Sequence, residues 1–300
     1  MRFSRNSGLL SAIAAFAIWG IFPLYWRLFA TIDSQEILAY RIWWSFVAML
    51  VLIIALKMGS KAKADFRELV KTPKRLCLMI ASSALISCNW GIYIWAVNDG
   101  RVLESSLGYY INPLVNVLLG MIFLSEKFNR WQALSFFLAT AGVLNMAVNI
   151  GTVPWVSLLL ALSMGLYSLC KKLLHMNVFT NMTIETAIIA PFALAYIGYA
   201  NAGQELFTGT VPFYLLLMST GVVTAIPLLL FANAANNLPL SIIGFTQYLS
   251  PTIIFLIAVF LYKEPFSQTH LFSFALIWLA LIIFTLANTG FFKMKNPAST

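Results

Sequence analysis

Long, nearly uncharged apolar segments recur along the whole of this sequence. A bilayer core about 30 Å thick is crossed by roughly 20 residues of helix, so runs of this length indicate membrane spans. Ten such runs are present, at residues 8–30, 35–56, 76–97, 102–124, 131–149, 154–174, 181–200, 212–232, 239–262 and 269–291. Only 10% of the 300 residues are charged and 61% are hydrophobic, which is too little charge to cover a water-facing surface. We therefore predict an all-α integral membrane protein with ten transmembrane helices.

The first apolar run resembles a secretory signal only superficially. Arg2 and Arg5 precede it, but the run is too long for a signal core and contains Trp19, Gly20, Pro23 and Trp26. We interpret it as a retained span. The connections between spans are short, except for a basic segment at 57–75 that has room for a short interfacial helix.

The distribution of basic residues predicts the orientation of the spans. The net charge is +9, but the Lys and Arg residues form short patches between apolar runs, so we expect no nucleic-acid partner. If both termini are cytoplasmic, 15 of the 19 basic residues lie inside, counting Lys171 and Lys172, and three lie outside. Because positive charge concentrates on the cytoplasmic side, we predict that both termini are inside.

Motifs for metal, cofactor or catalytic chemistry are missing from the sequence. The three cysteines form no CxxC pair and the two histidines lie far apart, so neither a disulfide framework nor a metal site is expected. There is no GxxxxGK[ST] phosphate loop and no GxSxG or HExxH motif. We predict no cofactor and no catalytic residues, and transport, if that is the function, would be passive or driven by a gradient.

A weak internal repeat divides the chain into two halves. Shifting the sequence by 138 residues places 96–128 on 234–266, and the matches include Tyr110 with Tyr248, Pro113 with Pro251 and Glu126 with Glu264. The halves are 8–149 and 154–291, and each holds five spans. Since five is odd, the second half is inverted, an arrangement typical of secondary transporters. The alternative is an old duplication kept only for packing.

Polar side chains form a stripe on the fourth span. Ser105, Tyr109, Asn112 and Asn116 recur at spacings of 4, 3 and 4 residues, which places them on one helical face. In a membrane this face contacts other protein or a watered cavity. Either interhelical hydrogen bonding or substrate binding accounts for it. Gln247 and Ser250 occupy the equivalent places of Tyr109 and Asn112 in the second half, which favours a cavity shared by the halves.

Two prolines lie within spans at matching places in the halves. Pro113 and Pro251 each leave a carbonyl without its usual helical partner. Bent spans are common where transporters build substrate sites, but proline is also often tolerated in membrane helices. We favour a hinge role for this symmetric pair.

Arg41 is the basic residue placed well inside a predicted span. Such a residue requires a partner. A structural ion pair with Glu36, Asp99 or Glu104 is one interpretation, and binding of an anionic group of the substrate is the other. Glu185, within the seventh span, is a weaker candidate for proton coupling.

Aromatic and amide side chains supply the remaining site candidates. Trp19 lies on one face of the first span, and Asn89 and Tyr93 share a face of the third. These residues could line a pocket for an apolar or aromatic solute. Core packing is the alternative for any single one of them.

Several segments resemble RarD-type members of the EamA group in the drug/metabolite transporter superfamily. They are residues 19–26 (WGIFPLYW), 36–41 (EILAYR), 89–98 (NWGIYIWAVN), 106–116 (SLGYYINPLVN), 224–231 (TAIPLLLF) and 244–252 (GFTQYLSPT). The resemblance implies a bacterial inner-membrane permease built from two inverted five-helix EamA repeats around a central cavity. It also implies a small-molecule solute, since relatives in the superfamily move amino acids and other metabolites and some are named for chloramphenicol sensitivity.

Two functions remain open at this point. The first is a secondary transporter of small organic solutes that works by alternating access. The second is an intramembrane enzyme acting on a lipid-linked substrate. The sequence does not determine the oligomeric state.

Overall fold

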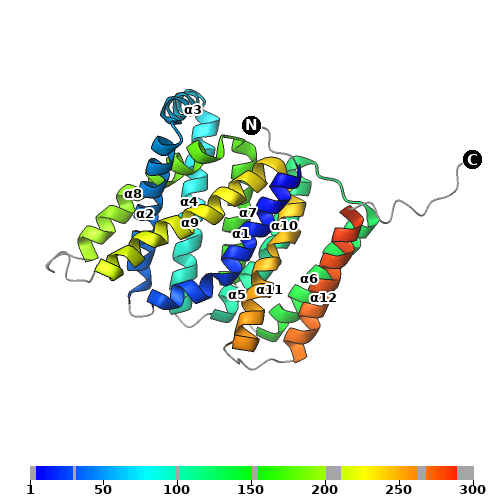
Figure 1. Ribbon diagram of the computed structural model, residues 1–300. Helices are drawn as coiled ribbons and strands as arrows, with labels where there is room; N and C mark the ends of the chain where they lie inside the picture. Colours follow the sequence, from blue (N-terminus) through cyan, green and yellow to red (C-terminus); the bar gives the residue numbers. More distant parts are fainter. Residues whose placement is uncertain are drawn as a thin grey trace, which may run out of the picture.

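The computed structural model describes residues 5–29, 32–98, 102–150, 155–200, 211–261 and 268–288, and within these ranges all regular structure is helical (Figure 1). The helices are α1 (Arg5–Trp26), α2 (Ser34–Ala55), α3 (Gly59–Lys71), α4 (Pro73–Asn98), α5 (Val102–Leu124), α6 (Arg130–Ile150), α7 (Trp155–Leu174), α8 (Val178–Ala200), α9 (Val211–Asn237), α10 (Leu240–Gln247), α11 (Leu249–Leu256) and α12 (Gln268–Asn288). A 3₁₀ turn (Arg27–Phe29) follows α1 and a π-helical turn (Ile257–Leu261) follows α11.

Eight of the described helices are long and apolar enough to cross a membrane. They correspond to the first eight predicted spans and comprise α1, α2 and α4 to α9. The ninth and tenth predicted spans coincide with shorter apolar helices, Leu240–Leu256 and Leu271–Ala287. The structure thus establishes a multi-pass helical architecture, while the full count of ten spans stays a prediction.

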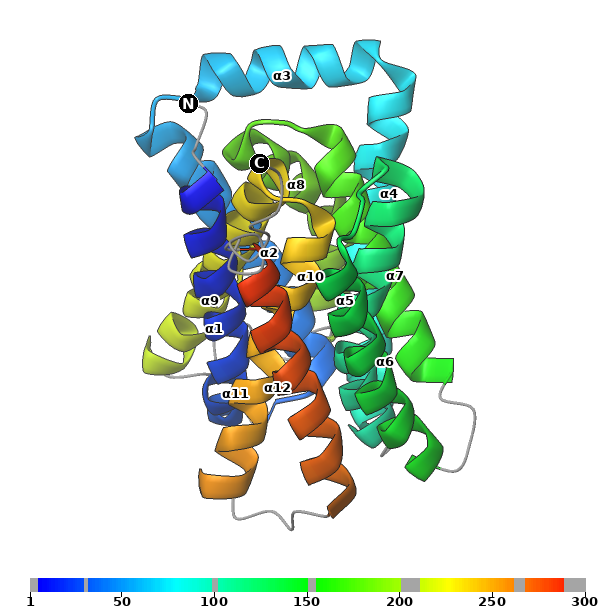
Figure 2. The same ribbon diagram turned by 90° about the vertical axis from the view of Figure 1, so that its right-hand side faces the viewer.

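Helix α3 forms where the basic 57–75 segment has room for an interfacial helix. Leu69 is completely buried, whereas Lys61, Lys63 and Arg67 are exposed, so the helix has one apolar and one basic face. Figure 2 shows α3 lying across one end of the bundle, here called the α3 end. Helix α1 begins and α12 ends toward this same end (Figure 2).

The bundle exposes apolar side chains and buries polar ones. Ile122, Phe137 and Phe192 are among the large exposed hydrophobic residues, whereas Asn116 and Lys171 are almost completely buried. This is the reverse of a soluble protein and suits a lipid surface around protein-facing polar groups.

The two predicted halves are interleaved in space. Helix α2 packs between α8 and α9, α4 and α5 pack on α7, α1 packs on α9, α10 and α11, and α12 packs on α6 (Figures 1 and 2). Each of these pairs joins a helix of 8–149 to a helix of 154–291. Any cavity at the centre is therefore walled by both halves.

Candidate functional site

A cavity of about 410 Å³ lies between the two predicted halves. This volume is within the usual range for small-molecule sites. Seven of the nine predicted substrate-binding residues line it, namely Trp19, Arg41, Asn89, Tyr93, Tyr109, Gln247 and Ser250. The hinge residue Pro251 also lines the cavity. Because these residues come from α1, α2, α4, α5, α10 and α11, the tertiary fold brings together positions that are more than 200 residues apart.

Arg41 is held by aromatic rings. Its guanidinium carbon lies 4.4 Å from the ring centre of Trp90 and 4.9 Å from that of Trp26, which is cation–π geometry. Its Nε is buried and has no hydrogen-bond partner. Among the described side chains, Glu36 included, no carboxylate forms an ion pair with Arg41. Asp99 and the side chain of Glu104 lie outside the described residues. Within the described part of the chain, the Arg41 charge thus contacts aromatic rings rather than carboxylates.

Aromatic and amide groups form the rest of the wall around Arg41. The rings of Tyr93 and Tyr109 meet edge to face with centres 5.7 Å apart. Asn89 is anchored to α7, since its Nδ2 donates to the carbonyl of Leu160 and to Oγ of Ser163, both at 2.9 Å. The wall thus offers flat apolar surfaces and a few fixed polar groups, which is the usual chemistry of a site for a small organic molecule.

Asn112 and Asn116 do not line the cavity, although they share the polar stripe with Tyr109. Asn112 Nδ2 donates to the carbonyl of Ala161 at 2.8 Å, and Asn116 Nδ2 donates to Gln247 Oε1 at 3.0 Å. Both side chains are almost completely buried. The part of the stripe formed by Asn112 and Asn116 therefore faces protein, because α7 and α10 pack against α5 there. Ser105, the fourth member, has a side chain outside the described set.

The two prolines lie in different surroundings. Helix α5 continues through Pro113, whereas the ninth predicted span breaks at Tyr248, three residues before Pro251. A Cβ added to Gly244 would lie 2.7 Å from the carbonyl oxygen of Pro113, so the two segments touch here. Tyr110 Oη donates to the carbonyl of Pro251 at 3.4 Å. Its repeat equivalent, Tyr248, has a buried hydroxyl without a partner.

Comparison with known proteins identifies the family of this chain. The EamA-like transporter family matches residues 6–148. YojE of Bacillus subtilis (strain 168), named an uncharacterized transporter, is 46% identical over 283 residues, which cover 94% of this chain and 95% of YojE. Protein RarD of Salmonella typhimurium is 44% identical, with the same coverage of both chains. The chain is a RarD-type member of the EamA-like transporter family.

The fold is also shared with a solved structure. A crystal structure that is 15% identical in sequence superposes with a TM-score of 0.72 over 95% of this chain and 99% of its own. From its family and its apolar helices, the RarD-type chain is a multi-pass membrane transporter, and the central cavity is its candidate site.

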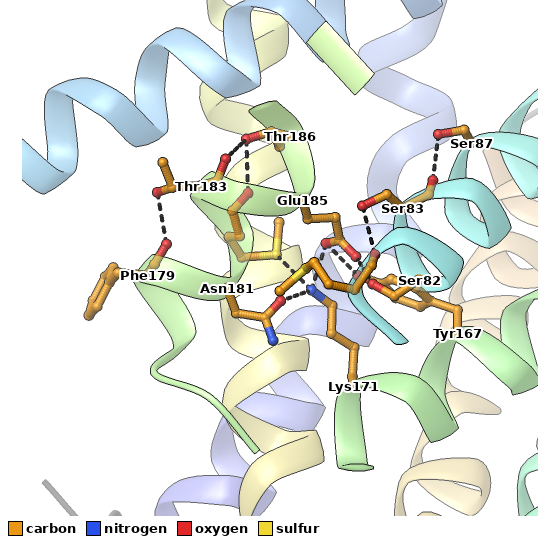
Figure 3. Close-up of polar contacts among 12 residues, drawn as sticks. Ser82, Ser83, Ser87, Tyr167, Lys171, Phe179, Asn181, Thr183, Glu185 and Thr186 are labelled. Carbon is orange, nitrogen blue, oxygen red and sulfur yellow. Dashed lines mark hydrogen bonds and ion pairs between the residues drawn. The ribbon is translucent and has the colours of Figure 1, made fainter. Parts of the chain in front are cut away.

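A buried ion pair lies near the end of α7 in this RarD-type transporter. Lys171 counts as a cytoplasmic charge in the topology argument, yet its side chain is 1% exposed. Its Nζ lies 2.6 Å from Oε2 of Glu185, whose side chain is 3% exposed (Figure 3). Lys171 is therefore a second buried basic residue besides Arg41. Lys171 lies three residues before the end of α7. At such a position, the helical face that carries a lysine determines whether its side chain points to solvent or into the protein.

Glu126, a repeat match in the sequence, caps a helix of the other half. Its carboxylate oxygens accept hydrogen bonds from the backbone N–H groups of Leu240 at 2.6 Å and Ser241 at 3.0 Å. Oγ of Ser241 donates to the same carboxylate at 2.5 Å. Those N–H groups are the free donors at the N-terminus of α10, where a negative charge is favourable. Glu126 therefore joins the end of α5 to the start of α10.

Proposed function

We propose that this RarD-type protein is a secondary transporter that moves small organic solutes, such as amino acids, metabolites or drugs, across the bacterial inner membrane by alternating access. The observation that carries the proposal is the cavity between the halves with the Arg41 charge at its wall. A solute with an anionic group and a flat apolar part complements Arg41, Trp26 and Trp90.

Hydrogen bonds at one end of the bundle support a state that is closed on that side. At the α3 end, Glu126 holds the start of α10, and Lys172 Nζ donates to the carbonyl of Leu238. Asn233 Nδ2 donates to Ser11 Oγ at 2.8 Å, which ties α9 to α1. The cavity instead extends to Phe29 and Ile32 at the connection between α1 and α2. With the predicted topology, this is an outward-facing state.

The pattern of helix packing supports an inverted repeat that can exchange its two halves. The helices of the first half, in chain order, are α1, α2, α4, α5 and α6. Their proposed equivalents in the second half are α7, α8, α9, the pair α10 and α11, and α12. With this correspondence, a twofold axis relates the contact between α1 and α9 to the contact between α7 and α4. The same axis relates the contact between α5 and α7 to the contact between α11 and α1. All of these contacts are present. Two halves related in this way can adopt each other's conformation and so open the opposite side.

Transport in proteoliposomes tests the proposal. The purified protein is reconstituted, and uptake of radiolabelled amino acids and chloramphenicol is compared with that of protein-free liposomes. We expect saturable flux of at least one solute, and excess unlabelled solute inside should accelerate uptake by exchange. No flux with any solute, together with turnover of a lipid-linked substrate, would instead support the intramembrane enzyme.

A further inference from the structure

We propose that the buried pair Lys171 and Glu185 is a proton-binding site that couples transport to the proton gradient, with Glu185 as the group that takes up the proton. The site lies outside the lining of the main cavity. The inference rests on the proposed transport function for its biological role, but proton binding itself can be measured without a solute.

Glu185 is surrounded by hydrogen-bond donors from two helices besides its own α8. Ser82 on α4 donates to Oε1 at 2.5 Å, and Lys171 on α7 donates to Oε2 at 2.6 Å. Tyr167 on α7 donates to Oε2 at 3.3 Å. Figure 3 shows these side chains converging on the carboxylate between α4, α7 and α8. The carboxylate therefore joins one helix of the first half to two helices of the second.

Lys171 keeps neutral partners that do not depend on Glu185. Its Nζ donates to Oδ1 of Asn181 at 2.6 Å (Figure 3), and it approaches the sulfur of Met182 at 3.6 Å. When a hydronium ion transfers a proton to a carboxylate oxygen of Glu185, one O–H bond of the hydronium ion breaks, one O–H bond forms on the carboxyl group, and a water molecule is released. The pair then carries one net positive charge in an apolar interior. Such a charge is unfavourable, so protonation favours another conformation in which Lys171 reaches water.

The pair lies one layer of side chains away from the main cavity. Glu185 borders a void of about 10 Å³, on the order of a single water molecule. Ile86, Trp90 and Leu228 line both this void and the main cavity. On α4, Ser82 is one turn closer to the α3 end than Ile86. The pair is therefore placed between the cavity and the closed end, as a proton in transit requires.

Two side-chain contacts link the pair to the solute site. Trp90 and Glu185 line the same small void. The ring centre of Trp90 also lies 4.4 Å from the guanidinium carbon of Arg41. Tyr167 stacks on Phe231 with ring centres 5.9 Å apart, and Phe231 lies 5.7 Å from the cavity residue Trp19. A change in charge at Glu185 thus acts on groups that contact the solute.

Few other ionisable groups face the pair from the helices packed around it. Helix α7 contributes Tyr167 and, nearby, Cys170. Helix α2 contributes Ile42 and Ser45 to the void and α9 contributes Leu228, none of which titrates. Arg75 at the start of α4 pairs with Glu68 on α3 at 2.6 Å, on the exposed surface. Helix α3, which packs on α4 and α8, carries Asp65, whose Oδ2 is buried without a hydrogen-bond partner. Among the described residues, Glu185 is the carboxylate that pairs with Lys171.

Infrared difference spectroscopy of the full-length protein in liposomes tests proton binding directly. Acidification of the wild type should produce the C=O band of a protonated buried carboxylic acid. The band should be absent from Glu185→Gln and present in the matched control Glu68→Gln. Because Glu185→Gln leaves Lys171 unpaired, the double variant Lys171→Met, Glu185→Gln provides a second sample without a lone charge. A band that persists in both Glu185 variants would overturn the proposal, as would a wild type without one.

Transport measurements test coupling and separate it from the proposed function. With a solute that the wild type transports, Glu185→Gln and the double variant should lower the ratio of pH-gradient-driven accumulation to solute exchange about tenfold or more, and Glu68→Gln should not. An unchanged ratio would refute coupling while leaving the transport function intact. If the wild type transports no solute, the proposed function fails, and the infrared result still decides whether Glu185 binds the proton.

Discussion

At the scale of single residues, Arg41 shows how aromatic rings stabilise a charge in the interior of a membrane protein. Two tryptophan rings stabilise the guanidinium through cation–π contacts, and such contacts do not require its N–H groups as hydrogen-bond donors to an oxygen. A carboxylate would occupy those donors. If the substrate carries an anionic group, we expect it to bind the N–H groups of this cation in the cavity.

Replacing Arg41 by Gln should weaken anionic solutes selectively. Loss of a charge-assisted hydrogen bond lowers binding by about 1.5–3 kcal/mol, or roughly ten- to a hundredfold in affinity. The measurement compares competition by a carboxylate solute and by its neutral amide in the same uptake assay. Arg41→Lys is the matched control and should lose less for the carboxylate. Equal losses for the two solutes would assign Arg41 a structural role.

The buried pair Lys171 and Glu185 should show strong energetic coupling. Glu185→Gln alone leaves a buried ammonium without its counter-charge and should destabilise the protein by about 3–5 kcal/mol. Adding Lys171→Met removes that charge, so the double variant should regain most of the stability. Thermal unfolding in detergent measures both. A double variant no more stable than Glu185→Gln would show that the two residues act independently.

At the scale of elements, the repeat-equivalent tyrosines indicate how the segments around Pro113 and Pro251 exchange roles. Tyr110 donates to the carbonyl of Pro251, while the hydroxyl of Tyr248 is buried without a partner. If the halves exchange conformations, Tyr248 would donate to the carbonyl of Pro113 in the opposite state and Tyr110 would be released. Each state would then contain one of the two bonds.

Conversion of each tyrosine to phenylalanine should therefore shift the conformational equilibrium in opposite directions. Tyr110→Phe should disfavour the state described here, and Tyr248→Phe should favour it, each by about 1 kcal/mol or roughly fivefold in the ratio of states. Ile37→Cys, in a chain whose native cysteines are replaced, reports access to the cavity through the rate of labelling by an impermeant maleimide. Shifts in the same direction would contradict the exchange.

The contact between α2 and α9 depends on a glycine. A Cβ on Gly221 would lie 2.2 Å from the carbonyl carbon of Trp44, so Gly221→Ala should destabilise the protein by about 1–3 kcal/mol through overpacking. Gly198 on α8 has nothing within 4 Å of the same position. Gly198→Ala should therefore be neutral or stabilise the helix by up to about 1 kcal/mol. Unfolding midpoints in detergent compare the two, and similar values would refute the close approach.

At the scale of the whole molecule, Glu126 holds the interleaved halves together at the α3 end. Glu126→Gln removes the charge that caps α10 and should weaken closure there by about 1–2 kcal/mol. The state open at the α1–α2 connection then becomes less populated, so labelling of the Ile37→Cys reporter should slow. Glu68→Gln, on the exposed surface, is the control. Unchanged labelling in Glu126→Gln would show that the cap does not bias the equilibrium.

Much of the architecture follows from the sequence alone. The first eight spans were predictable because a bilayer demands long apolar helices, and α3 was foreseeable because a basic segment of that length does not enter lipid. Tyr109 and Gln247 could be predicted as cavity residues because they occupy matching places in the two halves. Arg41 could be predicted because a charge within a span requires a partner, and Trp19 because it lies on one face of the first span.

Only the tertiary structure decided which way the side chains point and what they meet. Asn116 and Tyr109 share a helical face, but α10 covers the first and the cavity opens on the second. Lys171 reads as an anchoring charge in the sequence, and only the approach of α8 places it against Glu185. Hydropathy specifies which segments enter the membrane, because that depends on the composition of each segment. The contact partners of a side chain depend on packing between helices that are far apart in the chain, and the composition of a single segment does not specify this packing.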